Sequence, residues 1–188
     1  PFKIIYVSSV DFYKHQWNVV EAVSNIKKSG YPVTLDLYGS GNKRALKSLK
    51  ETICKYDKNK KFIRFNNEID YSEIQHVYFS ANLSIFASSC ETFGQILLES
   101  MASGLPIASS NMSAMPEILG DAAVYFNPLD IDDIENALRK LIDSREKRAN
   151  VAQAAYARAN NYSWDDTALR TFNFFLEVFK KHNEIIKS

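Results

Sequence analysis

Hydrophobic and polar positions follow two alternating patterns as far as residue 129. Short apolar runs rich in β-branched residues occur at 3–9, 33–38, 61–65, 83–87, 105–109 and 122–126. Stretches with apolar residues at helical spacing fill the gaps, at about 16–29, 42–56, 71–79, 93–103 and 113–119. Strands that alternate with helices predict a mostly parallel sheet covered on both faces. Its crossover connections should be right-handed.

Beyond residue 129 the pattern becomes purely helical, at about 130–142, 144–159 and 164–182. Asp130 and Ser144 precede two of these segments and are suitable N-cap residues. The predicted fold is therefore α/β: a three-layer αβα, Rossmann-like, doubly wound sheet of six strands with extra C-terminal helices. We expect residues 1–188 to form a single domain.

Composition narrows the class of protein. The chain has 46% apolar and 24% charged residues, which is ordinary for a soluble globular protein. The net charge of +1 argues against nucleic acid as the main partner. Two cysteines and three histidines show no metal-ligand spacing, so no metal site is predicted. No apolar run approaches the ~20 residues of a membrane span, and no signal peptide is recognised. We expect a cytoplasmic protein, and the strand directly at Phe2 suggests a domain cut from a longer chain.

Eight basic residues crowd the segment 43–61: Lys43, Arg44, Lys47, Lys50, Lys55, Lys58, Lys60 and Lys61. Such a segment could make a peripheral contact with an anionic membrane surface. A solvated helix face is the alternative, and Glu51 and Asp57 favour it because they interrupt the run.

Candidate chemistry centres on residues 88–106, which follow the predicted strand at 83–87. A helix should begin near Thr92 or Phe93, with Phe93 on its buried face. Glu91 precedes that start, and Glu99 lies about two turns into the helix on the same face as Gln95. A helix N-terminus can hold a phosphate, and carboxylates accept hydrogen bonds from hydroxyls. Together these groups suit a nucleotide sugar, although each glutamate alone could be an ordinary helix residue.

Two further positions could contact a ligand. Lys14 follows the first strand, where an ammonium group can neutralise phosphate, or it could be a solvated lysine before a helix. Gly39 and Gly41 follow the second strand, where glycines let the backbone approach a ligand closely. A tight turn is the alternative explanation for the two glycines.

The segment Glu91-Thr-Phe-Gly-Gln-Ile-Leu-Leu-Glu99, with Met101–Pro106 and Pro116-Glu117-Ile118, resembles the donor-binding half of a retaining glycosyltransferase of the GT-B fold. More narrowly, the chain resembles the group 1 (family 4) enzymes from Lys3 to about Phe179. The resemblance implies transfer of a sugar from a UDP- or GDP-linked donor to a hydroxyl, with retention and without a metal or other cofactor. It also implies a role in bacterial surface polysaccharide or lipopolysaccharide biosynthesis, at the inner face of the cell membrane.

The resemblance also implies roles for individual residues. Glu99 would bind the ribose hydroxyls, and Lys14 would hold the diphosphate together with the backbone N–H groups of Phe93, Gly94 and Gln95. Gly39 and Gly41 would lie near the diphosphate. Glu91 would contact the donor sugar as the catalytic residue, either as a nucleophile or as a stabiliser of positive charge. The chain departs from the family pattern where Ser9 replaces an arginine, His15 a glycine, Asn66 a glycine and Ala87 a proline.

The family has an N-terminal acceptor domain that is absent from this chain, and its last helix crosses back to that domain. Residues 164–182, rich in aromatics, would be this helix. The acceptor would be a glycan or a lipid-linked sugar, and the domain alone should be inactive. Two alternatives stay open: a sugar-nucleotide epimerase of similar fold, and a non-catalytic Rossmann-like module that binds a protein through its last helix. A dinucleotide oxidoreductase is disfavoured because no G-x-G-x-x-G follows the first strand.

Overall fold

A computed structural model describes residues 1–187, and their side chains through residue 183. Six strands form one sheet with the order β3-β2-β1-β4-β5-β6, and every pair of neighbours is parallel. The strands are β1 (Phe2–Val7), β2 (Val33–Tyr38), β3 (Ile63–Asn66), β4 (Leu83–Phe86), β5 (Ile107–Ser110) and β6 (Val124–Phe126). The central strands read as continuous apolar runs because helices cover both of their faces. All six predicted strands are confirmed, with bounds that differ by at most two residues.

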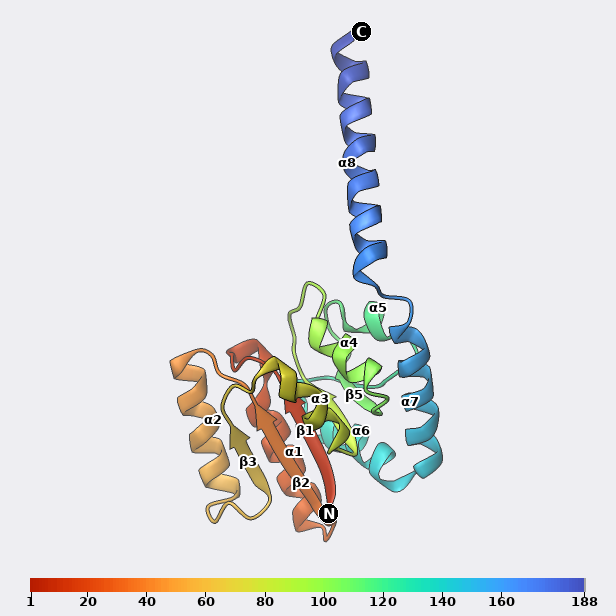
Figure 1. The fold of residues 1–188 in the computed structure, drawn as a ribbon. Helices are drawn as coiled ribbons and strands as arrows, with labels where there is room; N and C mark the ends of the chain where they lie inside the picture. The colour runs from red at the N-terminus through yellow and green to blue at the C-terminus, as the bar shows by residue number, and fades with distance from the viewer. Residues whose placement is uncertain (188) are drawn as a thin grey trace.

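Helices cover the sheet in two outer layers (Figure 1). They are α1 (Gln16–Lys28), α2 (Lys43–Tyr56), α3 (Ile74–Phe79), α4 (Gln95–Ala102), α5 (Met115–Leu119), α6 (Ile131–Asp143), α7 (Arg145–Ala159) and α8 (Trp164–Lys187), with 3-10 turns at Phe12–Lys14 and Tyr71–Glu73. Helix α1 packs against both α2 and α6 in one layer, and α3 contacts α4 through Tyr78. Helix α7 contacts α4 and α6, so it joins the two layers near β6. The three-layer, doubly wound prediction is confirmed.

Capping residues fix where the C-terminal helices begin. The Asp130 side chain accepts hydrogen bonds from the backbone N–H groups of Asp132 and Asp133, and the Ser144 side chain accepts one from Lys147. Both predicted N-caps are confirmed, since each satisfies N–H groups that have no partner inside the helix.

Helix α8 projects away from the sheet and its covering helices (Figure 1). It continues to Lys187, beyond the predicted end at residue 182. Its large apolar side chains, among them Phe172, Phe175 and Phe179, are exposed. No helix within residues 1–187 has both the length and the hydropathy that crossing a bilayer requires.

Candidate active site

The order of strands in the sheet reverses between β1 and β4. Chain connections run from β1 outward through β2 to β3, and then return to β4 and continue outward to β6. The loops that follow β1 and β4 therefore diverge, and a crevice at the carboxyl ends of these two strands is where doubly wound sheets bind ligands. Lys14 follows β1, and Glu91 follows β4. The topology brings these two predicted site residues to the same place.

Lys14 and Glu91 form an ion pair through Nζ and Oε1. The Lys14 side chain is only 5% exposed and that of Glu91 only 15%. The ammonium also lies 5.0 Å from the ring centroid of Phe86 and 5.1 Å from that of Tyr13. A buried cation needs a counter-charge, so the solvated alternative for Lys14 is wrong. The diphosphate and sugar ligands predicted for these two residues would have to compete with this ion pair.

Tyr6 connects the two loops that carry this ion pair. Its buried hydroxyl donates to the backbone carbonyl of Lys14 at 2.5 Å and accepts from the N–H of Ala87 at 3.1 Å. Burial raises the pKa of the Tyr6 phenol, which keeps the donating proton in place. Tyr6 was not among the predicted site residues; its only signal in the sequence is a hydroxyl group within an otherwise apolar strand.

Ser113, in the loop after β5, fixes the backbone of Glu91 from the other side. The N–H of Glu91 donates to Ser113 Oγ at 3.0 Å, and the same hydroxyl donates to the Glu91 carbonyl at 2.7 Å. Ser113 adopts a left-handed backbone with φ of 55°. Ser113 was predicted only as the start of the helix at 113–119, which begins at Met115, and its contact with Glu91 was not predicted because the two residues lie 22 positions apart.

Two departures from the family pattern lie beside Lys14. His15 has φ of 50°, a left-handed conformation that a glycine adopts without strain. Its Nε2 lies 2.9 Å from Ser89 Oγ, which compensates part of that strain, and burial lowers the pKa of its imidazole. Ser9, at the family's arginine position, is exposed. Lys14 is therefore the basic side chain that this loop contributes to the crevice.

Gly39 and Gly41, after β2, lie against the backbone of the loop that follows β1. A Cβ at Gly39 would lie 2.0 Å from the carbonyl oxygen of Ser8, and one at Gly41 would lie 2.4 Å from that of Val10. The backbone of the two loops is also hydrogen bonded, from Val10 N to Ser40 O at 2.8 Å and from Asn42 N to Val10 O at 3.0 Å. The close approach at these glycines is thus to the β1 loop, which they hold against the start of α2.

Helix α4 begins two residues later than predicted, at Gln95, and Gly94 precedes it in a left-handed conformation. Phe93 therefore lies outside the helix. The prediction that Phe93 is buried is wrong: it is 43% exposed, and its ring packs edge-on against Tyr162 with centroids 5.8 Å apart. No side chain caps α4. No side-chain cap therefore competes with an anionic ligand at the start of this helix, where only the N–H of Leu97 is bonded, to the Gly94 carbonyl.

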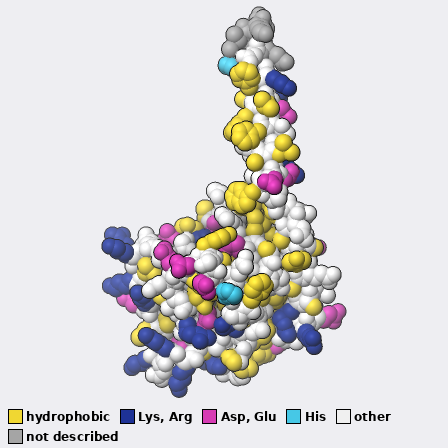
Figure 2. Space-filling model, viewed as in Figure 1, with side chains coloured by type: hydrophobic (Ala, Val, Ile, Leu, Met, Phe, Trp, Pro, Cys, Tyr) yellow, Lys and Arg dark blue, Asp and Glu magenta, His cyan; other side chains and the backbone are white. Residues whose placement is uncertain are grey.

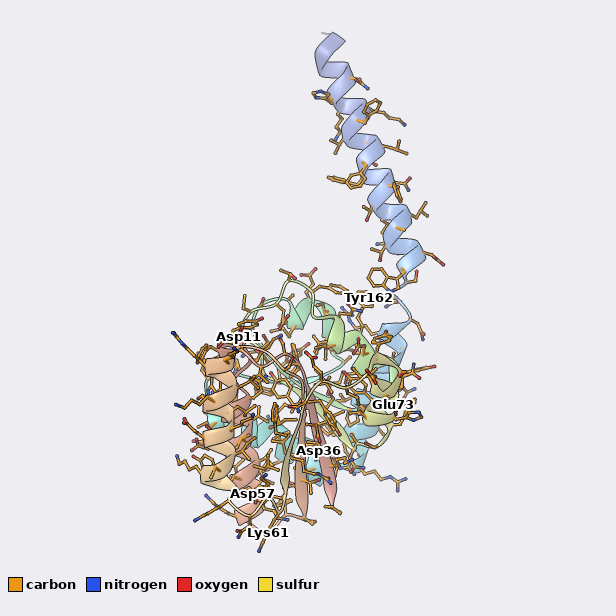
Figure 3. All side chains as sticks on the ribbon, turned by 60° about the vertical axis from the view of Figure 1, so that its left-hand side comes forward. Asp11, Asp36, Asp57, Lys61, Glu73 and Tyr162 are labelled. Atoms are coloured by element: carbon orange, nitrogen blue, oxygen red, sulfur yellow. The ribbon has the colours of Figure 1, made fainter. Side chains whose placement is uncertain are left out.

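Helix α4 buries one face, which carries Leu97, Ser100 and Met101. Glu99 lies on the opposite face of the helix. Its Oε2 accepts a long hydrogen bond, 3.5 Å, from the Tyr78 hydroxyl of α3, and it is half-buried. Burial raises the pKa of the Glu99 carboxyl, and the hydrogen bond from Tyr78 opposes that effect only in part. Glu99, Gln95 and Phe93 line a cavity of about 670 Å³ between α4 and the start of α8. Tyr162, labelled in Figure 3 at the base of α8, forms part of the opposite wall.

The predicted site residues thus fall into two groups. Lys14 and Glu91 meet at the ends of β1 and β4, whereas Phe93, Gln95 and Glu99 border the cavity beside α4. The short segment Glu91–Gln95 joins the two groups. A ligand with an extended anionic part and a hydroxyl-bearing part could reach from one group to the other across this segment.

The model of the family "Glycosyl transferases group 1" matches residues 1–158. The chain belongs to this family. It is 27% identical to O-antigen chain mannosyltransferase B of Escherichia coli over 114 residues, which are 61% of this chain and 30% of that protein. It is 25% identical to glycogen synthase of Mycobacterium tuberculosis over 182 residues, 94% of this chain and 42% of the synthase.

A solved structure supports the same fold for this glycosyltransferase domain. The structure of HepE from Anabaena, in complex with UDP and glucose, superposes with a TM-score of 0.81 at 20% identity. The match covers 94% of this chain and 48% of HepE. The chain therefore spans less than half the length of these relatives, and it corresponds to the donor-binding half of a GT-B glycosyltransferase.

Proposed function

We propose that this domain binds a nucleoside diphosphate sugar, UDP- or GDP-linked, for transfer of the sugar to a hydroxyl with retention of configuration. The observation that carries the proposal is the Lys14–Glu91 ion pair at the point where the sheet order reverses. A cation that can bind phosphate and a carboxylate that can face a sugar lie in contact at the ligand-binding edge of the sheet. Membership of the glycosyl transferases group 1 family favours this chemistry over the alternative of a sugar-nucleotide epimerase.

The diphosphate would take Lys14 away from Glu91. Its oxygens would accept from the Lys14 ammonium and from the N–H groups of Phe93, Gly94 and Gln95 at the start of α4. Gly39 and Gly41 would border the same anion, because they pack on the loop that leads to Lys14. Fixed protein charges would then neutralise the leaving group without a metal.

Release from Lys14 leaves the Glu91 carboxylate beside the bound sugar. As the bond from the anomeric carbon to the phosphate oxygen breaks, positive charge develops on the sugar ring. A carboxylate fixed through Ser113 would stabilise that charge more strongly in the transition state than in the bound donor. The acceptor hydroxyl would bond to the anomeric carbon from the face that keeps its configuration, and the hydroxyl proton would pass to the departing phosphate oxygen.

Glu99 would hold the ribose. Its carboxyl group borders the cavity beside α4, where its oxygens would accept hydrogen bonds from the ribose hydroxyls. The Tyr78 hydroxyl of α3 orients the Glu99 carboxyl through the hydrogen bond that it donates. The base would then occupy the same cavity, whose walls include Tyr71 and Leu98.

In the whole enzyme a second, N-terminal domain would bind the acceptor, and α8 would pack its exposed aromatic side on that domain. The family resemblance supports this arrangement, and so does the share of each relative that the chain leaves uncovered. The acceptor would be a glycan or a lipid-linked sugar of a bacterial surface polysaccharide, made in the cytoplasm at the inner face of the cell membrane. The exposed side of α8 then needs no separate protein-binding function.

Isothermal titration calorimetry of this chain with UDP, GDP, ADP and their glucose and mannose conjugates would test the proposal. We expect weak binding of one nucleoside diphosphate, unchanged by a chelator. Binding of none of the nine ligands, or binding only with added metal, would contradict it. Thermal melting in the same buffer verifies that the chain is folded.

A further inference from the structure

The segment 43–64 carries nine basic and two acidic residues, and the remainder of the chain carries 14 basic and 20 acidic residues. The chain's small net charge therefore hides a strong separation of charge. Residues 43–64 form α2, the loop after it and the edge strand β3. In Figure 2 the Lys and Arg side chains gather on the left and lower left of the body, where Figure 1 places α2. We refer to the exposed basic residues of 43–64 as the basic face.

Of the two acidic residues within 43–64, Glu51 and Asp57, only one lowers the positive charge of the exposed surface. Asp57 points inward: it is 5% exposed, and its carboxylate accepts hydrogen bonds from the N–H groups of Lys61, Phe62 and Ile63 at 2.7–2.9 Å. Glu51 is exposed and lies 3.9 Å from Lys47. The basic residues from Lys43 to Lys61 are all exposed. Glu51 is therefore the one acid that interrupts the exposed basic residues of this segment.

A groove of about 590 Å³ runs between α2 and β3 within the basic face. Its rim carries Lys50, Lys58, Lys60 and Arg64, and its floor includes the apolar side chains of Ile53, Ile63 and Phe65. Arg64 is already paired with Asp36 at 2.8 Å, which leaves the three lysines to face an incoming anion. A rim of ammonium groups over an apolar floor suits a phosphate group attached to an apolar chain.

The predominance of lysine over arginine in the basic face favours some anionic partners over others. Seven of the eight basic residues in 43–61 are lysines. Lysine acts as a point charge, whereas arginine is preferred where bases or single phosphates are recognised by paired hydrogen bonds. Many lysines on one helix and its following loop suit a diffuse anionic surface, and juxtamembrane clusters of this kind bind anionic lipids.

We propose that the basic face docks this domain on an anionic lipid bilayer, with a lipid phosphate in the α2–β3 groove. Helix α2 begins next to the donor site, because Asn42 donates its N–H to Val10 of the β1 loop. Docking through α2 and β3 therefore holds the carboxyl edge of the sheet beside the membrane without covering it. The inference does not depend on the identity of the donor.

The test measures binding of the chain to vesicles by co-sedimentation. We expect binding to phosphatidylcholine vesicles that contain phosphatidylglycerol, loss of binding at high salt, and little binding to phosphatidylcholine alone. Equal binding to neutral vesicles would overturn the proposal and assign the contact to the apolar side of α8. Tighter binding to duplex DNA than to anionic vesicles at the same salt concentration would overturn it in favour of nucleic acid.

Charge-reversal variants locate the contact. Lys43→Glu, Lys50→Glu and Lys58→Glu together should weaken binding to anionic vesicles on the order of tenfold or more, given the contribution of each basic residue near an anionic surface. The matched control reverses three exposed charges on α6 and α7, Lys140→Glu, Arg145→Glu and Lys147→Glu, and has the same net charge. Binding of this control should stay within about twofold of the unmodified chain. Equal losses in the two variants would contradict the proposal, and melting curves verify that both are folded.

Discussion

Under the proposed function, Lys14 and Glu91 would each exchange one partner for another at the carboxyl ends of β1 and β4. In the structure they pair with each other, and both are largely buried. In the proposed reaction Lys14 pairs with the diphosphate and Glu91 faces the sugar. Breaking a buried ion pair is unfavourable unless each charge gains a new partner. The complete donor supplies both partners and should therefore bind more tightly than a nucleoside diphosphate, which supplies only one.

Glu91→Gln in the full-length enzyme should lower kcat on the order of a hundredfold or more, comparable to the loss of one preorganised electrostatic contact. The substitution keeps the shape of the side chain and removes its charge. Steady-state kinetics and a melting curve of the same variant give the measurement. Glu135→Gln, which disturbs an ion pair on α6 with Arg139, is the control and should keep a normal kcat. A near-normal kcat for Glu91→Gln would remove this residue from the chemistry.

Lys14→Ala should weaken binding of the nucleoside diphosphate far more than binding of the nucleoside, because the ammonium contacts phosphate and not the base. Glu91→Gln should have the opposite effect on the nucleoside diphosphate and tighten its binding, since it frees Lys14. Calorimetry with both ligands measures the difference, and Lys140→Ala on α6 is the control. Equal losses for nucleoside and diphosphate in Lys14→Ala would show that Lys14 acts only through the fold.

Glu99→Ala should weaken binding of the nucleoside diphosphate by about 1–3 kcal/mol, the range for hydrogen bonds to a charged group. The melting temperature should change little, because the contact with Tyr78 is long at 3.5 Å. Glu117→Ala, an exposed glutamate on α5, should leave the affinity unchanged. Unchanged affinity in the Glu99 variant as well would mean that the ribose lies elsewhere.

At the scale of elements, the α2–β3 loop depends on one carboxylate. Asp57 ends α2 and accepts from three consecutive N–H groups at the start of β3 (Figure 3). Burial alone would raise the pKa of its carboxyl, but the three N–H groups and Lys61 outweigh burial, so that the pKa lies below the ordinary value. Asp57 thus fixes the register between the helix and the edge strand, and with it the groove of the basic face.

Asp57→Asn should lower the free energy of unfolding at neutral pH by about 1.5–3 kcal/mol, because a charged acceptor of buried hydrogen bonds is lost. A pKa that is lower in the folded state adds stability above the ordinary aspartate pKa, and this stability is lost as the pH falls through the folded value. The difference between the two proteins should therefore shrink as the pH falls below about 4. Urea unfolding at several pH values measures it. Asp143→Asn, at an exposed position on α6, should show no such difference, and a pH-independent gap for Asp57→Asn would contradict the assignment.

At the scale of the whole molecule, the proposal assigns the donor site to this domain and the acceptor site to an N-terminal domain. The exposed apolar side of α8 extends away from the sheet (Figure 1). An exposed apolar surface of this kind marks a site of interaction with another surface. In the proposed enzyme the N-terminal domain would cover it and would place the acceptor hydroxyl opposite Glu91.

The 188-residue chain should therefore bind its nucleoside diphosphate but transfer no sugar from the donor. The measurement is release of the nucleoside diphosphate from the donor, with the full-length enzyme as the positive control at the same concentration. Robust transfer by the isolated chain would show that the acceptor site lies within these residues. Addition of the separate N-terminal domain should restore some activity if the two halves associate through α8.

Local patterns were enough to predict the elements and the order in which they occur. The period of apolar residues is set by neighbours within a few positions, so the six strands, the covering helices and the caps at Asp130 and Ser144 could be read from the sequence. The spacing of Glu91 and Glu99 around a helix start likewise identified the family, which the match over residues 1–158 confirms. The start of α4 was predicted two residues too early, because the left-handed conformation of Gly94 makes the helix begin at Gln95. Phe93 therefore lies before the helix and is exposed.

Tertiary structure alone decided which charges meet. Lys14 and Glu91 are 77 positions apart, and they come together because β1 and β4 are neighbours in the sheet. The same adjacency places the Tyr6 hydroxyl between Lys14 and Ala87, and the neighbouring strand β5 brings Ser113 to Glu91. No local pattern encodes these contacts, since each depends on the order of parallel strands. The sequence by itself therefore determined the family and the chemical groups available, whereas the folded sheet determined which of those groups act on one another.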